Sequence, residues 1–393
     1  MDIERLIGIE SVREFFNIED TNNISARARE FMEVMDSAVF EPGEEIVSYG
    51  DTSESGMYII LKGSAEVVSP NGIIVNNLVV GDFIGERALI KDDVRAATVR
   101  ALEYVECAHI SRALFEDIAD KNRRIYAFII DMLYEKTTRL VMKQQRINTE
   151  LEIAAIIQES MLEHDFSHIN LLPDIHFYAE TKPAKEVGGD FYDVFMIDEN
   201  RLCFLVADVA GKSISAAMFM MMSKTYIKNF ALVGMPINEV AFKTNNALAA
   251  NNAADIFVTA FLCVLDITTG QLQYVNCGHN RPYISRNGND FVMMSKDEAQ
   301  ADLVIGVIPD TPYSLQTTNL YPGDKIFMYT DGITEALNNK GEFFDDSGLM
   351  RALNDADKTR DPKEFVDDVY EAMMEFVGDA QQSDDVTMVY LSR

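Results

Sequence analysis

The sequence predicts a multidomain α+β protein with an N-terminal β-roll, a helical linker and a C-terminal α+β sandwich. A chain of 393 residues exceeds the roughly 150 residues of a typical single domain. Short strand-like runs fill residues 38–110, no glycine or proline occurs from residue 111 to 172, and strands and helices alternate after that. The 48% of hydrophobic residues can bury sizeable cores. We therefore expect domains at 1–120 and 171–393, joined by a linker at 121–170.

The N-terminal segment reads as several short strands separated by turns. The runs EEIVSYGD, GMYIILKGSAEVV, GIIVNNLVVGD and RAATVRALEYVECAHI carry β-branched or aromatic residues bounded by Gly, Asp or Asn. Many short strands at regular spacing are typical of a β-roll or barrel. A helical stretch at 25–35 is expected to pack beside it.

The linker has the composition of long helices, because it lacks both helix breakers. A residue recurs every seven positions at Tyr126, Leu133, Leu140, Ile147, Ala154 and Met161. The companion positions are apolar at Ile129 and Ile157 and charged between them, so the heptad seam is weak. Two interpretations remain: a dimeric coiled coil, or amphipathic helices that pack on the flanking domains.

The C-terminal segment alternates irregularly between strands and helices. The expected strands are RLCFLVADVAG, DIFVTAFLCVLDI, GQLQYVNCGH, DKIFMYTDG and DDVTMVYLS, and the expected helices are SISAAMFMMMSKTYIKNFAL, PINEVAFKTNNALAANN and PKEFVDDVYEAMMEFV. The helices cluster in two places rather than following every strand. This order favours an α+β sandwich over a doubly wound sheet.

Composition disfavours several classes of protein. The formal charge of −30 repels a nucleic-acid backbone. The acidic N-terminus is unlike a signal peptide, and no apolar run approaches the roughly 20 residues that a membrane span needs. The four cysteines lie in apolar runs without a CxxC pair, as expected of buried thiols in a reducing cytoplasm. We expect a cytoplasmic protein with no membrane span and no nucleic-acid partner.

Aspartates stand at the ends of several strand-like runs in the C-terminal half. They are Asp190 in VGGD, Asp208 in FLVADVAG, Asp331 in FMYTDG, and Asp384 with Asp385 in SDDVT. Carboxylates at strand ends can project into one rim of a sheet, and Mg²⁺ and Mn²⁺ prefer such oxygen ligands. Each aspartate alone is more often a turn or cap residue, so the case for a metal site depends on the combination. The histidines are scattered, which disfavours zinc.

The ordered motifs EVGGDFYDVF, ADVAGKSISAAMFM, NCGHNRPYI, YTDGITEA and DDVTMVYL resemble the SpoIIE/RsbU-type branch of the metal-dependent PPM serine/threonine phosphatases. The likeness runs from about Leu151 to the C-terminus. It implies an αββα sandwich and a centre of two Mn²⁺ or Mg²⁺ ions. The residues that it places around the ions are Asp190, Asp208 with the Val209 carbonyl, Asp331 and Asp384. The same resemblance implies that Asp208 bridges both ions. It also implies that Asp193 contacts the residues that hold the ions and not the ions themselves.

Other residues near these motifs have alternative roles. The GGDEF motif of diguanylate cyclases needs a glutamate where this chain has Phe191. The family often has a second glycine where this chain has Ser213 after Lys212. His279 is expected to hold a turn, with acid–base catalysis as the alternative. Lys182 and Lys185 are expected to be solvated rather than to contact phosphate.

In the N-terminal half, GDFIGERALIKDDVRAATVRA offers backbone N–H groups, a carboxylate and an arginine at close spacing. This stretch resembles the phosphate-binding cassette of cyclic nucleotide-binding domains, and the likeness covers about Met35 to Asp120. It implies that Arg95 holds the cyclic phosphate, that Glu86 accepts from the ribose 2′-OH, and that Gly85, Ala88 and Ala96 make backbone contacts. Ala96 favours cAMP over cGMP. A domain with this fold that binds no nucleotide is the alternative.

Together the resemblances imply a cyclic-nucleotide-regulated phosphatase that acts on phosphoserine or phosphothreonine of a protein partner, such as an anti-sigma-factor antagonist. We expect a homodimer through the helical linker, which passes the nucleotide signal to the strands bearing Asp190 and Asp208. The main alternative is a nucleotide-gated scaffold with an inactive phosphatase domain. A nucleotide-dependent transcription regulator is disfavoured by the charge.

Overall fold

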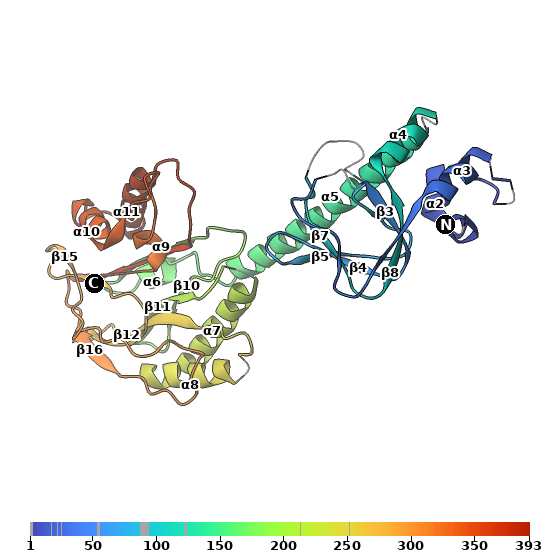
Figure 1. The fold of residues 1–393 in the computed structure, drawn as a ribbon. Coiled ribbons are helices and arrows are strands. Elements are labelled where there is room, and N and C mark those ends of the chain that lie inside the picture. The colour runs from blue at the N-terminus through green and yellow to red at the C-terminus, as the bar shows by residue number, and fades with distance from the viewer. Residues whose placement is uncertain are drawn as a thin grey trace. The chain divides into compact units, whose positions relative to one another are not determined.

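The computed structural model describes residues 3–16, 18–21, 23–24, 26–52, 56–86, 94–121, 124–212, 214–250 and 252–393. The chain divides into two compact units, residues 1–145 and 146–393, and each has its own hydrophobic core (Figure 1). None of the described helices has the length and apolar character that a bilayer crossing requires.

The N-terminal unit contains two four-stranded antiparallel sheets. One sheet has the order β1-β8-β3-β6 and the other β2-β7-β4-β5. The strands are β1 (Asp36–Phe40), β2 (Glu45–Val47), β3 (Met57–Lys62), β4 (Ala65–Val68), β5 (Ile74–Leu78), β6 (Phe83–Ile84), β7 (Thr98–Ala101) and β8 (Val105–Ile110). Helices α1 (Ile3–Gly8), α2 (Glu10–Phe16) and α3 (Ala26–Val34) precede them. Side chains from these helices, such as Phe15 and Met32, share a core with Ile59 of β3.

Two helices follow the strands, α4 (Arg112–Lys121) and α5 (Arg124–Glu159). Helix α5 is 36 residues long, and it continues from the first unit into the second. The absence of glycine and proline predicted this length. Within the second unit, Ile147 and Ile157 of the expected heptad seam are 42% and 52% exposed in the single chain.

The C-terminal unit contains two five-stranded antiparallel sheets. Their orders are β10-β11-β12-β13-β16 and β15-β14-β17-β18-β9. The strands are β9 (His176–Lys182), β10 (Phe191–Met196), β11 (Arg201–Val209), β12 (Val258–Asp266), β13 (Gln271–Cys277), β14 (Tyr283–Ser285), β15 (Phe291–Met293), β16 (Gln316–Asn319), β17 (Lys325–Tyr329) and β18 (Val386–Ser392). Strand β11 is buried along almost its whole length, which explains its continuous apolar run.

Helices cover the outer faces of both sheets, so the unit has four layers (Figure 1). The helices are α6 (Ser167–Asn170), α7 (Ile214–Leu232), α8 (Ile237–Ala249), α9 (Asp331–Thr334), α10 (Asp345–Asp355) and α11 (Pro362–Val377). Helices α7 and α8 pack on the first sheet, and α10 and α11 form a core with the second. The predicted β-rich N-terminal domain and αββα sandwich are therefore confirmed.

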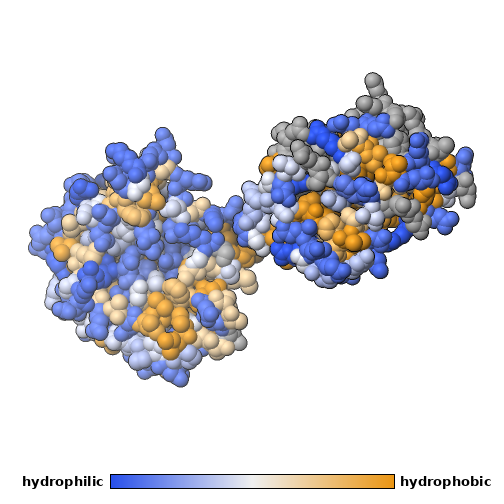
Figure 2. All heavy atoms as spheres, in the orientation of Figure 1, coloured by the Kyte–Doolittle hydropathy of each residue, from blue (hydrophilic) through white to orange (hydrophobic). Residues whose placement is uncertain are grey.

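The surface of the C-terminal unit is mainly hydrophilic, with an apolar area on the face seen in Figure 2. Exposed apolar side chains include Ile214, Met218 and Met222, which follow each other by one turn along α7. A hydrophilic surface is expected of a chain with a formal charge of −30.

Candidate metal centre and ligand site

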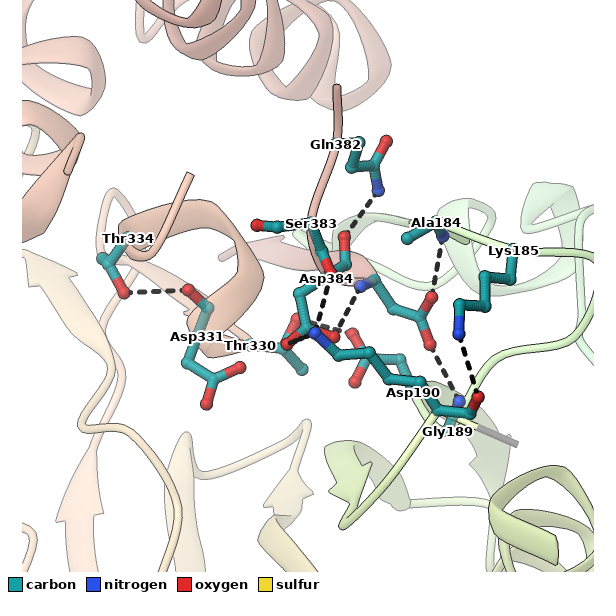
Figure 3. A network of polar contacts seen from close by, with 12 residues as sticks. Ala184, Lys185, Gly189, Asp190, Thr330, Asp331, Thr334, Gln382, Ser383 and Asp384 are labelled. Atoms are coloured by element: carbon teal, nitrogen blue, oxygen red, sulfur yellow. Dashed lines mark hydrogen bonds and ion pairs between the residues drawn. The ribbon is translucent and has the colours of Figure 1, made fainter. Parts of the chain in front are cut away.

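Four aspartates lie where strands of the two C-terminal sheets begin or end. Asp190 immediately precedes β10 and Asp208 is the second-last residue of β11, both in the first sheet. Asp331 begins α9 with one residue between it and the end of β17, and Asp384 lies two residues before β18, both at the second sheet. We call Asp190, Asp208, Asp331 and Asp384 the carboxylate rim; Figure 3 shows three of its members close together.

Asp190 is held by two threonines of the second sheet. Its Oδ2 accepts hydrogen bonds from Thr330 Oγ1 at 2.6 Å and Thr387 Oγ1 at 2.8 Å. The backbone N–H of Thr387 donates to Thr330 Oγ1 at 2.9 Å, so the three residues form one network. Only 4% of Asp190 is exposed. These contacts connect an aspartate of one sheet to the strand ends of the other.

The rim is electrostatically strained because like charges meet in a buried place. Burial and, secondarily, the charge of Asp208 raise the pKa of Asp190 well above its ordinary value. Burial and the charge of Asp331 raise the pKa of Asp208 to about 7, although a hydrogen bond with Asp190 opposes the shift. Burial, Glu335 and Asp384 raise the pKa of Asp331. Such a group of carboxylates favours either protons or cations.

Two glycines bring the loop before β10 close to its neighbours. A Cβ on Gly189 would lie 2.6 Å from the Val209 carbonyl oxygen, and one on Gly188 would lie 2.5 Å from Asp385 Oδ2. Asp385 fixes the same loop, because its Oδ2 accepts from the Gly189 N–H and its Oδ1 from the Ala184 N–H, each at 2.8 Å. The Val209 carbonyl therefore faces the loop that ends in Asp190.

The C-terminal part of α5 is attached to the same loop. Gln158 is 8% exposed and makes two hydrogen bonds with Gly188. Its Nε2 donates to the Gly188 carbonyl at 2.7 Å, and its Oε1 accepts from the Gly188 N–H at 3.0 Å. A displacement of this helix would therefore pull directly on the backbone two residues before Asp190.

Lys212 provides a cation at the rim. Its Nζ lies 2.7 Å from Asp384 Oδ2 and donates to the Ser383 carbonyl, also at 2.7 Å. Its hydrogen bond with Asp384 and the nearby charges of Asp384, Asp385 and Asp331 outweigh desolvation and raise the pKa of Lys212. Asp384 is thus engaged by an ammonium group in this structure.

The donor set of the rim fits a hard divalent cation, since it consists of carboxylates and one backbone carbonyl. Their mutual repulsion would be relieved by positive charge. Within the described part of the chain, however, no three His, Cys, Asp or Glu side chains already converge as a metal-binding group. Only Oδ2 of Asp190 is engaged by the two threonines, whereas Asp384 Oδ2 is paired with Lys212, so an ion that binds Asp384 must displace that ammonium group.

His279 connects the two sheets next to the rim. Its Nε2 lies 3.0 Å from the Tyr329 carbonyl, which only accepts, so Nε2 carries the proton. Its Nδ1 then accepts from Thr259 Oγ1 at 2.7 Å, and Thr259 is the β12 partner of Asp208. Burial lowers the pKa of His279 to about 4, so the ring is neutral near pH 7. These contacts favour the structural role over acid–base catalysis.

Of the other residues singled out from the sequence, Asp193 and Lys182 contact residues outside the rim, whereas Lys185 contacts Lys212 beside it (Figure 3). Asp193 is buried and forms ion pairs with two α7 lysines, with Lys224 Nζ at 2.8 Å and Lys228 Nζ at 3.5 Å. Lys182 pairs with Glu180 and lies over the Tyr370 ring. Lys185 is exposed and donates to the Lys212 carbonyl at 3.4 Å.

In the N-terminal unit the structure brings together Gly85, Glu86 and Arg95, which we call the Arg95 site. The guanidinium of Arg95 donates to the Gly56 carbonyl at 2.6 Å and to the Gly85 carbonyl at 3.1 Å. Gly85 has φ +80°, and a Cβ there would lie 2.1 Å from Arg95 Nη1. Arg95 and Glu86 are both buried, whereas Ala96 is exposed. Ala88 lies outside the described residues.

Sequence reasoning missed several functional neighbours of the rim. They are Gln158, Lys212 as an ion-pair partner, Thr259, Thr330, Thr387, and Asp385 as a loop anchor. Thr330 and Thr387 could have been noticed because each is adjacent to, or within three residues of, a rim aspartate. Gln158 and Thr259 carry no local signal, because their partners are 30 and 20 residues away.

Comparisons with known proteins agree with both halves of the fold. Residues 198–393 match the family Stage II sporulation protein E (SpoIIE), and residues 38–122 match the cyclic nucleotide-binding domain. The chain is 30% identical over 263 residues to phosphoserine phosphatase RsbU of Bacillus subtilis, covering 67% of this chain and 75% of RsbU. It is 29% identical over 276 residues to protein IcfG of Synechocystis sp., covering 62% of this chain and 41% of IcfG. It thus spans less than half of IcfG.

A solved structure shows the same C-terminal fold. The SiaA-PP2C domain of Pseudomonas aeruginosa aligns with a TM-score of 0.56 at 22% identity, over 64% of this chain and 98% of that domain. The matched families, the identity to RsbU and this likeness of fold agree with one another. The chain therefore belongs to the SpoIIE family of PPM-type protein phosphatases, and it carries a cyclic nucleotide-binding domain on the N-terminal side of its phosphatase domain.

Proposed function

We propose that this protein is a divalent-metal-dependent phosphatase for phosphoserine or phosphothreonine in a protein partner, and that a cyclic nucleotide regulates it. The observation that carries the proposal is the carboxylate rim, where aspartates from both sheets meet and where burial, together with their mutual repulsion, raises the pKa of Asp190, Asp208 and Asp331. A buried group of this kind is costly for the fold unless cations neutralise it.

Asp208 and Asp331, with the Val209 carbonyl, would hold the ions together with Asp384 and Asp190. When bound, two Mn²⁺ or Mg²⁺ ions would activate a water nucleophile and offset the charge of the phosphoryl group. The chain's own contribution is positional: Thr330 and Thr387 orient Asp190, Asp385 fixes the preceding loop, and Lys212 must leave Asp384. Once released, the Lys212 ammonium is available to a phosphate dianion.

The regulatory ligand is a cyclic nucleotide, with cAMP favoured by Ala96. Support comes from the family match over residues 38–122 and from a buried guanidinium beside a glycine that cannot carry a side chain. Arg95 would exchange its carbonyl partners for the cyclic phosphate, and Glu86 would accept from the ribose. Helix α5 would pass the signal on, because Gln158 at its C-terminal part holds the loop before Asp190.

The proposals for the protein partner and for a homodimer are supported by the resemblance and by exposed apolar side chains. RsbU is named as a phosphoserine phosphatase, which supports a phosphoserine monoester as substrate. An anti-sigma-factor antagonist is the partner that the resemblance favours. The exposed Ile147, Ile153 and Ile157 of α5 support a homodimer through this helix. The buried, unpaired thiols of Cys107, Cys203, Cys263 and Cys277 are in keeping with the cytoplasm.

The test is hydrolysis of p-nitrophenyl phosphate and of a phosphoserine protein by the purified full chain, in Mn²⁺ with and without cAMP. We expect turnover that EDTA abolishes and that cAMP changes. Turnover indifferent to cAMP would overturn the regulatory part alone. No turnover of either substrate, with Mn²⁺ binding absent by calorimetry, would overturn the enzyme and favour a nucleotide-gated scaffold.

A further inference from the structure

A pocket of about 600 Å³ opens beside the carboxylate rim and has no role in the function proposed above. Asp331 and Glu335, from α9 and the residue after it, line one part of it. Arg281, in the turn after β13, and Lys296, after β15, line another part. The buried ring of His279 also contributes to its lining. A group bound at Asp331 therefore lies at the edge of this pocket.

The two cations differ in how they are held. Arg281 Nη1 donates to the Met294 carbonyl at 2.7 Å, which fixes the direction of its guanidinium. Lys296 is exposed and makes no hydrogen bond or ion pair with any residue that the structure describes. In a chain with 64 acidic and 34 basic residues, two cations together beside the rim are a distinctive local feature. An arginine whose guanidinium is held in one direction and a lysine without a partner among the described residues can both bind carboxylates.

The position of the pocket restricts its occupant. A phosphorylated side chain held at the rim must be followed by the rest of its polypeptide, which needs space next to Asp331. A volume of about 600 Å³ exceeds what a phosphate alone requires and is in the range of pockets that hold a ligand of many atoms. The charge of Asp331 would be offset by the ions, which leaves two cations, Arg281 and Lys296, and two carboxylates, Glu335 and Asp346. Selection of a substrate therefore depends on where the two cations lie in the pocket and not on its net charge.

We propose that this pocket binds the polypeptide next to the phosphorylated residue, and that Arg281 and Lys296 select a substrate with a carboxylate in that segment. This inference rests on the proposed phosphatase function and names the substrate class of the same site. Lys296, which has no competing partner among the described residues, is the main determinant of specificity, and Arg281 supports it.

The test compares two phosphoserine peptides that differ only in having glutamates or lysines beside the phosphoserine. The quantity measured is the ratio of kcat/KM for the glutamate peptide to that for the lysine peptide, so that any general loss of activity cancels. We expect the wild-type ratio to exceed about fivefold, to fall in Lys296→Gln, and to fall below one in the Arg281→Glu/Lys296→Glu double variant. Lys243→Glu, an exposed position on α8 outside the pocket, should leave the ratio unchanged.

The outcomes separate this inference from the proposed function. One contrary outcome is that wild-type protein hydrolyses p-nitrophenyl phosphate and yet shows a kcat/KM ratio near one, and another is that the Lys296 variants keep the wild-type ratio. Either result would show that the pocket does not select peptides with carboxylates beside the phosphoserine. If neither p-nitrophenyl phosphate nor peptide is hydrolysed, the proposed function fails. Fluorescence anisotropy of the same labelled peptides in Mn²⁺ then still decides the pocket, because equal affinities would overturn it.

Discussion

The carboxylate rim and the Arg95 site solve opposite electrostatic problems. At the rim, buried acids repel one another, and protonation or a cation relieves the repulsion. At the Arg95 site, a buried guanidinium already donates to two backbone carbonyls. An incoming ion therefore stabilises the rim outright, whereas an anion at the Arg95 site must compete with existing hydrogen bonds. We therefore expect metal binding at the rim to stabilise the folded protein strongly. We expect the Arg95 site to bind its ligand with only moderate affinity.

The largest effect is expected from removing the acid that would bridge the ions. Asp208→Asn should lower Mn²⁺-dependent turnover more than about 100-fold, because the amide cannot replace a shared anionic ligand. Kinetics with p-nitrophenyl phosphate measure this, with the exposed turn variant Asp198→Asn as the control. Turnover of Asp208→Asn within tenfold of wild type would contradict a metal centre at the rim.

At the Arg95 site, Arg95→Gln should weaken cAMP binding by about 10- to 100-fold, since a charge-assisted contact to phosphate is lost. Calorimetric titration of the full chain measures this loss. Arg100→Gln is a matched control, because that arginine lies in β7 and pairs with Glu66 instead. Equal cAMP affinity of wild type and Arg95→Gln would show that the ligand, if any, binds elsewhere.

The strain at the rim predicts a pH dependence that metal abolishes. The pKa of Asp208 in the folded protein is about 7, which is above its ordinary value of about 4. The folded protein therefore holds this proton more tightly than the unfolded chain. The resulting contribution to the free energy of unfolding is fully present below about pH 4 and is lost as the pH rises to about 7. Metal-free protein should therefore lose about 2–3 kcal/mol of rim-derived stability between pH 5 and 8, because each pH unit between the two pKa values corresponds to about 1.4 kcal/mol. The contribution of Asp208 is obtained by comparing the pH dependence of thermal unfolding between wild-type protein and Asp208→Asn. A wild-type slope identical to that of the variant, or unaffected by Mn²⁺, would contradict the strain.

Gln158 tests whether the two sites communicate. Gln158→Leu removes both hydrogen bonds to Gly188 and should lower Mn²⁺ affinity about tenfold and reduce the response to cAMP. Gln158→Glu keeps an acceptor for the Gly188 N–H and should lie between leucine and wild type. The exposed Glu152→Gln on the same helix is the control. An unchanged cAMP response in Gln158→Leu would exclude this route.

The smallest effect concerns the contact that His279 makes between the sheets. Thr259→Val removes the hydroxyl that donates to Nδ1 and should weaken Mn²⁺ binding about threefold, whereas Thr259→Ser should restore it. Calorimetry of Mn²⁺ binding distinguishes this from a general loss of stability, which would lower the melting temperature in both variants. Wild-type Mn²⁺ affinity in Thr259→Val would show that the contact only supports the fold.

How far sequence reasoning reached differs between the two regions. The residues of the Arg95 site fall within one short stretch, Gly85 to Ala96, so a local motif was enough to name them. The rim residues are spread from Asp190 to Asp384, and only the order of several motifs indicated that they belong together. The long helices were predictable from missing glycine and proline, but the three-residue strands β14 and β15 were not, since a run so short has no clear period.

By itself, the sequence determined the class of each half, the length of the helical connection and the identity of the acids at the rim, because apolar periodicity, helix breakers and motif order are properties of the chain. Only the tertiary structure decided which groups hold those acids. Thr330 and Thr387 donate hydrogen bonds to Asp190. Gln158 is hydrogen-bonded to Gly188, and Lys212 forms an ion pair with Asp384 of the other sheet. The physical reason is that hydrogen bonds and ion pairs depend on distances of a few ångströms between distant segments, which only the packing of two sheets against each other sets.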